Sequence, residues 1–291
     1  MDNGAKANSK DEVYGSPLSA AASNGQLEMA ELLISKGAKV NSSGGAYGSP
    51  LSFAANNGHT AVMEYLLKEG AEIDATGGAY GMALATAANN GPSESVKFLL
   101  DKGANTDISA RAYGTALNTA ANNGHAETIK LLLDNKADPD QIGGAYGSAL
   151  STAANNGHNE TIEMLLARGA DIDQTGGAYG TALNTAANNG HSETIKLLIA
   201  KGADMNISSG AYGTALNTAA NNGHKKTLEL LLSNGADIDL DGGAYGTNLG
   251  TAANNGHNAT VKLLLSKGTD INHTGGAYGT ALNTAANNGH T

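Results

Sequence analysis

Apolar residues recur along this chain at helical spacing, in short stripes separated by glycine. Within residues 179–211, the first stripe occupies positions i, i+3 and i+4 of one helical face and consists of Leu183, Ala186 and Ala187. Thr181 can cap the N-terminus of this helix. Gly190, after Asn189, can end it because glycine readily adopts the left-handed conformation. The pattern therefore predicts a short helix between these two signals.

A second stripe follows after a short turn. It predicts a helix from about Ser192 to Ala200 that is ended by Lys201-Gly202, and its inward side chains would be Thr194, Ile195, Leu198 and Ile199. Residues 203–211 are rich in turn formers and lack helical periodicity, so they predict an extended loop or hairpin. Neither helix can bury its stripe alone, so each needs a neighbouring copy packed at about 8–10 Å.

This unit of helix, turn, helix and loop repeats with a fixed period. The dipeptide Tyr-Gly recurs every 33 residues, at Tyr14, Tyr47, Tyr80, Tyr113, Tyr146, Tyr179, Tyr212, Tyr245 and Tyr278. Such a period is typical of a solenoid, whose stability is mostly a sum of contacts between neighbouring repeats. We predict a single all-α array over residues 1–291, with a partial unit at 1–13, complete units at 14–46, 47–79, 80–112, 113–145, 146–178, 179–211, 212–244 and 245–277, and a partial unit at 278–291.

The repeated text resembles that of the ankyrin repeat. The order T-A-L, A-A, N-G-H, L-L-L and G-A-D matches the family's pattern, and Ser16-Pro17-Leu18 and Ser49-Pro50-Leu51 are the nearest copies of its T-P-L-H. The resemblance implies an ankyrin-type solenoid that binds a protein partner through its hairpin tips and first helices. The phrase G-G-x-Y-G-x-A-L is also similar to arrays in fungal proteins, among them NOD-like (STAND) receptors. That similarity implies the ligand-sensing array of a larger receptor.

The chain departs from the family's pattern at three positions. Alanine replaces the proline in most copies. Asparagine replaces the family's histidine at Asn118, Asn184, Asn217 and Asn283, and glycine replaces its hairpin aspartate at Gly143, Gly176 and Gly242. We therefore expect the geometry and hydrogen bonding of the hairpins to differ from the family's.

Both ends of the sequence fall inside a repeat. Residues 3–8 align with residues 201–206, and the chain stops at Thr291, before the second helix of its last unit. Neither end has the polar capping repeat that usually finishes such an array, so we expect a piece of a longer array. A monomer is expected, with end-to-end association through the uncapped termini as the alternative.

Composition and charge narrow the range of partners. The net charge is −10, from 17 basic and 27 acidic residues, which disfavours nucleic acid and anionic membrane surfaces. The chain has no cysteine, which excludes disulfides and thiolate chemistry and suits a reducing compartment, so a cytoplasmic location is expected. The polar N-terminus is unlike a signal peptide, and no apolar run is long enough to span a membrane.

The polar motifs predict no catalysis, cofactor or metal site. The histidines of the N-G-H motif would lie about 10 Å apart in stacked repeats, too far to share a metal, and predict a role in the turn. The phrase G-G-A-Y-G lacks the spacing of a phosphate-binding loop and predicts a turn with positive φ. The aspartate pairs after the second helices predict a solvated acidic edge. They are Asp138 and Asp140, Asp171 and Asp173, and Asp237 and Asp239.

Variation between repeats predicts where a partner is recognised. Identical side chains cannot distinguish one irregular protein surface from another, whereas the pair of residues before each glycine pair differs from copy to copy. Candidate contact residues in these pre-glycine pairs are Ile108, Gln141, Ile142, Gln174, Ile207, Leu240, Asp241 and His273. We expect the apolar members, such as Ile108, Ile207 and Leu240, to be exposed and to act as contact anchors, and we expect His273 to be solvated.

The constant face gives a second hypothesis. Its side chains would read a periodic ligand, such as a carbohydrate or a filament, by stacking and amide hydrogen bonds, and they include Tyr146, Tyr179, Tyr212, Asn155, Asn188 and Asn221. The structural alternative is that each tyrosine packs between neighbouring units and each asparagine caps or bridges helices. A further alternative is a spacer or scaffold without a specific target.

Overall fold

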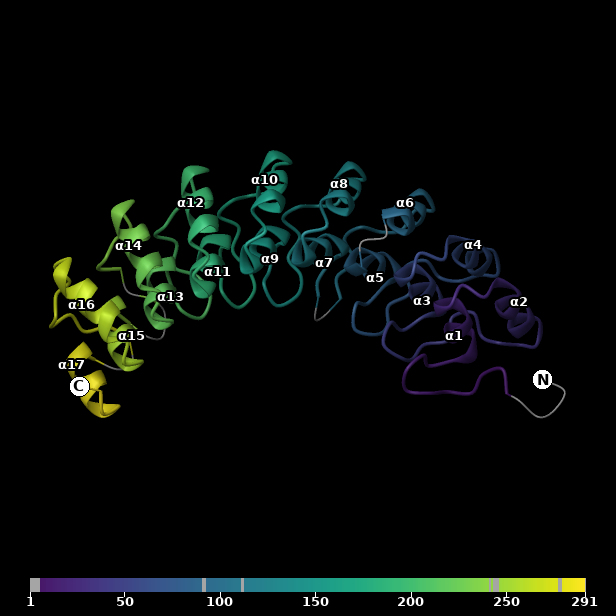
Figure 1. Cartoon of the computed structure of the whole chain (residues 1–291), viewed down its shortest axis with the longest axis horizontal. Coiled ribbons are helices and arrows are strands. Elements are labelled where there is room, and N and C mark those ends of the chain that lie inside the picture. The colour runs from purple at the N-terminus through teal and green to yellow at the C-terminus, as the bar shows by residue number, and fades with distance from the viewer. Residues whose placement is uncertain are drawn as a thin grey trace. The chain divides into compact units, whose positions relative to one another are not determined.

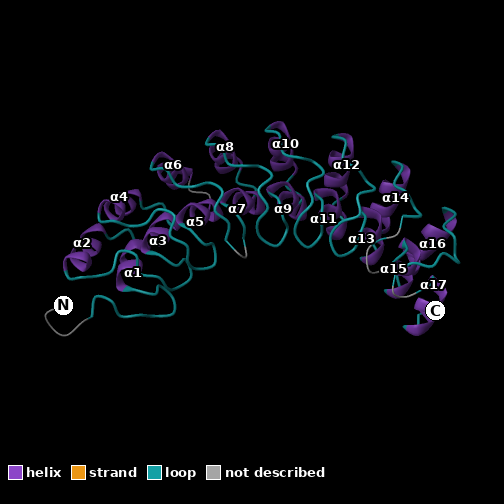
Figure 2. Cartoon of the chain, turned by 180° about the vertical axis from the view of Figure 1, so that it is seen from behind, coloured by secondary structure: helices purple, strands orange, loops and turns teal. Residues whose placement is uncertain are grey.

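The computed structural model describes residues 6–90, 93–110, 113–240, 242, 246–276 and 279–290. The chain divides into two compact units, Met1–Ala145 and Tyr146–Thr291. The division falls between two of the repeats predicted from the Tyr-Gly period. Helices and loops account for the described residues, which contain no strand (Figure 2). The all-helical solenoid predicted from the sequence is therefore confirmed.

The first unit is built from four pairs of helices. The first helices of the pairs are α1 (Pro17–Ser23), α3 (Pro50–Asn56), α5 (Ala83–Asn90) and α7 (Ala116–Asn123). The second helices are α2 (Leu27–Ser35), α4 (Thr60–Lys68), α6 (Ser93–Asp101) and α8 (Ala126–Asp134). First helices pack on first helices and second helices pack on second helices, so that the unit has two rows (Figure 1).

The second unit continues the same alternation. Its first helices are α9 (Ala149–Asn156), α11 (Ala182–Asn189), α13 (Ala215–Asn221), α15 (Asn248–Asn254) and α17 (Ala281–Asn287). Its second helices are α10 (Asn159–Ala167), α12 (Ser192–Ala200), α14 (Lys225–Ser233) and α16 (Asn258–Ser266). Here too each helix packs on its counterpart in the adjacent repeat.

Local signals set the ends of these helices. Thr181 caps α11, because its hydroxyl oxygen accepts a hydrogen bond from the backbone N–H of Asn184 at 3.2 Å. Gly190 ends α11 in the left-handed conformation, with a φ of 70°. The second helix then runs from Ser192 to Ala200. The helix boundaries predicted for this repeat are confirmed.

The first helices α3 to α15 are buried on most of their surface and form the core, whereas α17 is largely exposed. In α11 the small and apolar side chains are at most 1% exposed, as in Ala182, Leu183, Thr185, Ala186 and Ala187. Alanine lets neighbouring helices approach closely, and one leucine per repeat fills the space between them. This core needs few large side chains, consistent with a composition in which only 4% of residues are aromatic.

The second helices bury a narrower stripe than the sequence suggested. In α12, Thr194, Ile195 and Leu198 are buried. Ile199, which was expected to face inward with them, is only half-buried. The expectation for Ile199 was wrong because the second helices form the outer row and pack on the first row along one flank only.

The loop after each second helix ends in a tight hairpin. Gly176 and Gly180 form an isolated antiparallel bridge, in which Gly176 N donates to Gly180 O at 3.2 Å. Neighbouring hairpins are also joined, since Ala211 N donates to Ala178 O at 3.0 Å. The loops of each unit consequently run side by side along the row of first helices (Figure 2). This stack of hairpins carries the residues that the sequence selected for recognition.

Candidate partner-binding surface

Glycines of the repeated phrase let the hairpins stack backbone against backbone. Gly78 has a φ of 64°, and a Cβ there would lie 2.5 Å from the carbonyl carbon of Tyr47 in the preceding hairpin. Gly147 has a φ of 91°, and a Cβ there would lie 2.6 Å from the carbonyl carbon of Gly176 in the following hairpin. Neither distance leaves room for a side chain. The predicted positive φ is confirmed, and the stacking of the hairpins explains why these glycines recur.

The tyrosines of the phrase form a row of stacked rings in each unit. In the first unit the ring centroids of Tyr80 and Tyr113 are 4.4 Å apart, with planes 27° from parallel. In the second unit Tyr179 lies 6.2 Å from both Tyr146 and Tyr212, at 15° in each case. The ring faces thus pack against the rings of neighbouring repeats. Tyr80 and Tyr179, which have a tyrosine on each side, therefore offer a ligand their edges and hydroxyls rather than their ring faces.

Electrostatics around Tyr80 show where this row lies relative to the asparagines. Burial raises the pKa of the Tyr80 phenol, and the adjacent Tyr113 hydroxyl raises it further. A hydrogen bond with the side chain of Asn89 opposes that shift. Asn89 is the counterpart of Asn155 and Asn188 in its repeat. The tyrosine row and the asparagine row therefore meet on one face.

The asparagines are hydrogen-bonded to one another from repeat to repeat. Asn189 Nδ2 donates to Asn155 Oδ1 at 2.8 Å and to Asn155 O at 3.1 Å. Asn222 Nδ2 makes the equivalent bond to Asn188 Oδ1 at 3.1 Å. Asn255 Nδ2 donates to Asn221 Oδ1 at 2.9 Å. The side chains proposed as ligand readers at Asn155, Asn188 and Asn221 are thus engaged in bridging helices.

The histidines add a second link between repeats. His191 Nε2 lies 2.9 Å from Asn155 O, and His224 Nε2 lies 3.0 Å from Asn188 O. Because a carbonyl only accepts, the ring nitrogen is the donor in each bond. The sequence predicted a role in the turn, and the bond spans 36 residues. The ring therefore holds the helix end and turn of the preceding repeat.

The acidic edge also joins the repeats. Asp173 Oδ1 accepts a hydrogen bond from the backbone N–H of Asp204, 31 residues away, at 3.0 Å. Asp171 Oδ1 accepts one from Asp173 N at 3.0 Å. This aspartate pair therefore closes its own turn and holds the next one, and Asp138 and Asp237 close their turns in the same way by accepting from Asp140 N and Asp239 N. The sequence reading of a merely solvated edge missed this role, because a backbone partner leaves no signature in the sequence.

The asparagines that replace the family's histidine tie the first helices to the hairpins. Asn184 Nδ2 donates to Gly213 O in the next hairpin at 2.8 Å, and Asn217 Nδ2 donates to Gly246 O at 3.2 Å. Both asparagines are at most 1% exposed. These two side chains, which the sequence marked as departures from the family's pattern, thus link each first helix to the next hairpin.

The pre-glycine pairs are split between a half-buried and an exposed residue. The first member is half-buried at Ile108, Gln141, Gln174, Ile207, Leu240 and His273. The expected exposure of Ile108, Ile207, Leu240 and His273 is corrected accordingly, because the stacked hairpins partly cover this position. The second member is exposed in the described copies, and Ile142 is its apolar example, at 40% exposed. Asp241 lies outside the described residues.

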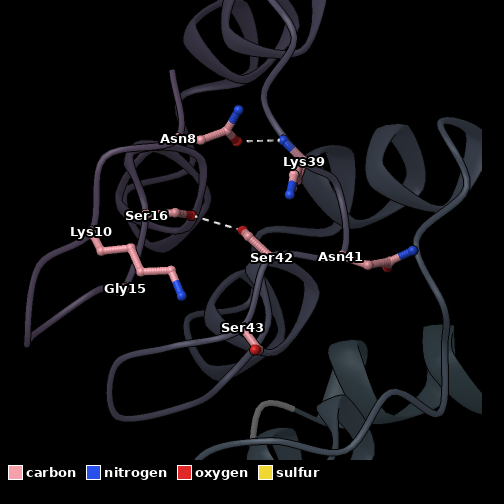
Figure 3. A pocket seen from close by; sticks show the side chains of 8 residues that line it. All are labelled: Asn8, Lys10, Gly15, Ser16, Lys39, Asn41, Ser42 and Ser43. Carbon is pink, nitrogen blue, oxygen red and sulfur yellow. Dashed lines mark hydrogen bonds between the residues drawn. The ribbon is translucent and has the colours of Figure 1, made fainter. Parts of the chain in front are cut away.

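Clefts open between neighbouring hairpins in the first unit, and pre-glycine residues line them. One cleft, of about 440 Å³, is lined by Thr76, Ser109 and the hairpin glycines Gly77, Gly78 and Gly81. Another, of about 280 Å³, is lined by Gly15, Ser16, Ser42 and Ser43 together with Lys10 and Lys39 (Figure 3). Pre-glycine residues of the first unit thus line clefts on the hairpin stack, while the candidate contact residues selected from the sequence are not among the lining residues of these two clefts.

Within the described ranges, no group of three histidine, aspartate or glutamate side chains is placed to hold a metal ion. Among the described helices, none has both the length and the apolar character required to cross a bilayer.

Comparison with known proteins identifies the class to which this solenoid belongs. The family model described as ankyrin repeats (3 copies) matches residues 1–77, 84–176 and 150–242, and the model described as ankyrin repeat matches residues 249–275. The chain belongs to the ankyrin repeat family, whose repeats are generally protein-interaction modules. Among solved structures it is similar to the human ASB11 ankyrin repeat domain, with 29% identity and a TM-score of 0.62, over 76% of this chain and 99% of that one. No curated protein matches the sequence.

Proposed function

We propose that this ankyrin array binds a protein partner through its stacked hairpins, and that the pre-glycine pairs set the specificity. One observation carries the proposal: the second pre-glycine residue is exposed in the described copies, and Ser43, Thr76 and Ser109 at this position line clefts between hairpins of the first unit, whereas the constant tyrosine and asparagine side chains contact each other. The mechanism is recognition by a preorganised surface, in which little conformational entropy is lost because the backbone is already stacked.

The exposed Ile142 is the strongest single anchor in this proposal. An apolar side chain that is 40% exposed in a loop gains from being covered by a partner. Gln141 and Gln174 offer amide donors and acceptors in the same register of successive repeats. The half-buried Ile207, Leu240 and His273 contribute the parts of their side chains that remain accessible to a partner. Asp241 remains a candidate contact residue.

The ligand-sensing array of a larger receptor is the specific setting that we propose. Its support is the phrase G-G-x-Y-G-x-A-L, which recurs here with little change and is similar to arrays in fungal receptors. The full-length gene tests this setting. A nucleotide-binding switch domain in the same reading frame is the expected result, and its absence would argue for an independent adaptor.

Two matched variants test the recognition surface once a partner has been isolated. The first replaces Gln141, Ile142 and Gln174 by Ser or Thr and leaves every tyrosine and asparagine intact. We expect its affinity, measured by titration calorimetry, to fall at least about tenfold, because contact anchors are removed, while the melting temperature hardly changes. The control variant converts Tyr146, Tyr179 and Tyr212 to Phe, which keeps the ring stack and removes the hydroxyls. We expect it to bind as the parent does.

The reverse outcome overturns the proposal. If the Ser/Thr variant binds normally and the Phe variant does not, the constant face is the site and the ligand is periodic. If neither variant changes the affinity of any captured protein, the spacer or scaffold alternative is favoured.

A further inference from the structure

One hairpin cleft differs from the others in charge. Lys39 stands at the position where the next two repeats carry Glu72 and Asn105 and the later repeats carry Asp138, Asp171, Asp204, Asp237 and Asp270. Lys6 occupies the same position one repeat earlier. Lys10 stands at the second pre-glycine position, where the following repeats carry Ser43, Thr76 and Ser109. In a chain with a net charge of −10, these lysines place cations on the hairpin edge, and Asp11 and Glu12 follow Lys10 in sequence.

The structure brings Lys10 and Lys39 to the same cleft. We call this cleft, of about 280 Å³ and lined by Asn8, Lys10, Gly15, Ser16, Lys39, Asn41, Ser42 and Ser43, the basic hairpin cleft. In Figure 3 the Lys10 side chain is directed into it from the loop before α1, and Lys39 lies on the neighbouring loop. Both lysines are exposed. Their two ammonium groups can therefore act on one ligand.

The two loops that carry these lysines are held together by hydrogen bonds. Asn8 Oδ1 accepts from Lys39 N at 2.8 Å, and Asn8 Nδ2 donates to Gly37 O at 2.9 Å. The Ser16 and Ser42 hydroxyls are 3.0 Å apart across the base of the cleft. The backbone around the cleft is thus fixed in advance, which lowers the entropic cost of binding.

Neither lysine is paired with a carboxylate in the cleft. No acidic residue lines the cleft, and among the described residues neither Lys10 nor Lys39 forms an ion pair. The acidic side chain next to Lys10 in sequence, Asp11, is turned to its own backbone, where Oδ1 accepts from Val13 N at 2.8 Å and from Tyr14 N at 2.7 Å. The cleft thus presents two free cations, with the Ser43 hydroxyl exposed beside them.

We propose that the basic hairpin cleft binds an anionic segment of a peptide, through carboxylate or phosphate groups that contact Lys10 and Lys39. The inference rests on the proposed function and gives the chemistry of the partner at one end of the first unit. Paired opposite charges orient a partner and speed its association more than they add affinity. The neutral cleft lined by Thr76 and Ser109 is an internal control, because it has the same register in the repeat and no charged lining residue.

The test uses three labelled peptides of the same length. The acidic peptide is rich in aspartate and glutamate, the amide peptide has asparagine and glutamine in their place, and the phosphoserine peptide carries phosphoserines. Amide shifts of the full chain, followed by NMR during titration, report the site. We expect the acidic peptide to shift Lys39 and Ser43 but not Thr76 and Ser109, and the amide peptide to shift none of them. Tighter binding of the phosphoserine peptide assigns the anion to phosphate, and equal or weaker binding assigns it to carboxylate. Both results support an anionic ligand.

A charge-matched pair of variants makes the result specific. Lys10→Ser with Lys39→Asp restores the residue types of later repeats, and Lys97→Ser with Lys130→Asp makes the same change in charge on exposed positions of α6 and α8. We expect the first variant to lose about tenfold in affinity for the acidic peptide, measured by fluorescence anisotropy at low salt, and the second to lose less than about twofold.

Equal losses in the two variants, or no shift at Lys39 and Ser43 with any peptide, would overturn the inference. Either failure is separate from failure of the proposed function, which depends on Gln141, Ile142 and Gln174 and on an isolated partner.

Discussion

At the scale of single residues, the handedness of the backbone decides which side chain fits after a second helix. Gly103, Gly169 and Gly202 take this position with φ of 86°, 89° and 96°. Lys136 occupies it after α8 and is the non-glycine residue with left-handed φ, at 68°, among those described. A Cβ in this conformation costs roughly 1–2 kcal/mol, so this repeat carries a strain that its neighbours avoid.

Replacing Lys136 with glycine is expected to stabilise the protein. Lys136→Gly removes the Cβ from the left-handed backbone, and part of the gain is offset by the greater freedom of glycine in the unfolded chain. The free energy of unfolding in urea should rise by about 0.5–1 kcal/mol. Asn135→Gly is the control, because Asn135 has a φ of −96° and gains nothing from glycine. Destabilisation by both substitutions would contradict the argument.

Buried hydroxyls depend on the residue that begins the preceding second helix. Thr194 Oγ1 donates to Asn159 Oδ1 at 2.7 Å. Thr260 lies at the equivalent position in α16, where its hydroxyl is buried and has no partner among the described residues. The residue that corresponds to Asn159 there is Lys225, whose ammonium cannot accept a hydrogen bond.

Lys225→Asn is therefore expected to stabilise the second unit. A new acceptor for Thr260 contributes about 1 kcal/mol. Loss of the exposed ion pair between Lys225 and Glu229, at 3.4 Å, costs less than about 0.5 kcal/mol. Thermal unfolding checks the sign, and Asn159→Lys should lower stability by leaving Thr194 unpaired. If Lys226→Asn, on the next residue of α14, stabilises equally, the gain does not come from Thr260.

At the scale of elements, contact with the neighbouring hairpin restricts which residues fit in each hairpin. Gly202 and Gly210 both have left-handed φ, at 96° and 69°. A Cβ on Gly202 would meet nothing within 4 Å, whereas one on Gly210 would collide with Tyr179 and lie 2.8 Å from Gly180 N. The two glycines share a conformation and differ in what stacks against them.

Gly210→Ala is expected to destabilise the protein more than Gly202→Ala. Both variants place a Cβ in the left-handed region, at roughly 1–2 kcal/mol. Only Gly210→Ala also pushes two hairpins apart, which adds about 1–3 kcal/mol. Chemical denaturation measures the difference, and amide exchange at Ala211, whose N–H bonds to Ala178 O, should rise in Gly210→Ala alone. Equal effects of the two variants would argue that backbone stacking is not the reason why glycine recurs at the position of Gly210.

At the scale of the whole molecule, stability follows from contacts between adjacent repeats. In each compact unit a helix packs on its counterparts in the flanking repeats and on its own partner helix. Hydrogen bonds of the asparagine, histidine and aspartate side chains connect the same neighbours. Such a chain loses structure locally before it unfolds as a whole.

Leu183→Ala tests this local behaviour. Leu183 is 1% exposed in the core of α11, and its truncation should cost about 2–5 kcal/mol. Amide protection should fall most in α11 and its neighbours α9 and α13. Leu282 occupies the same position of the repeat but is 71% exposed, so Leu282→Ala should cost less than about 0.5 kcal/mol. A uniform loss of protection across the second unit after Leu183→Ala would contradict nearest-neighbour stability.

The sequence determined the elements of this protein because their signals are local. The cap at Thr181, the stop at Gly190 and the stripe through Leu183 each act within one or two turns of helix. The 33-residue period then gave the positions of all the remaining repeats. Variation between copies also located the pre-glycine positions that line the hairpin clefts.

The tertiary structure decided which polar side chains are free to bind. His191 finds its partner 36 residues away and Asp173 finds one 31 residues away, so no local pattern announces either bond. Ile207 and Leu240, at the first pre-glycine position, are half-buried, and Ile142, at the second, is exposed, although the sequence pattern treats the two positions alike. The physical reason is that the burial and hydrogen bonding of a side chain in a stacked array depend on how the neighbouring repeat packs against it. The sequence of one repeat does not specify how closely the next repeat packs.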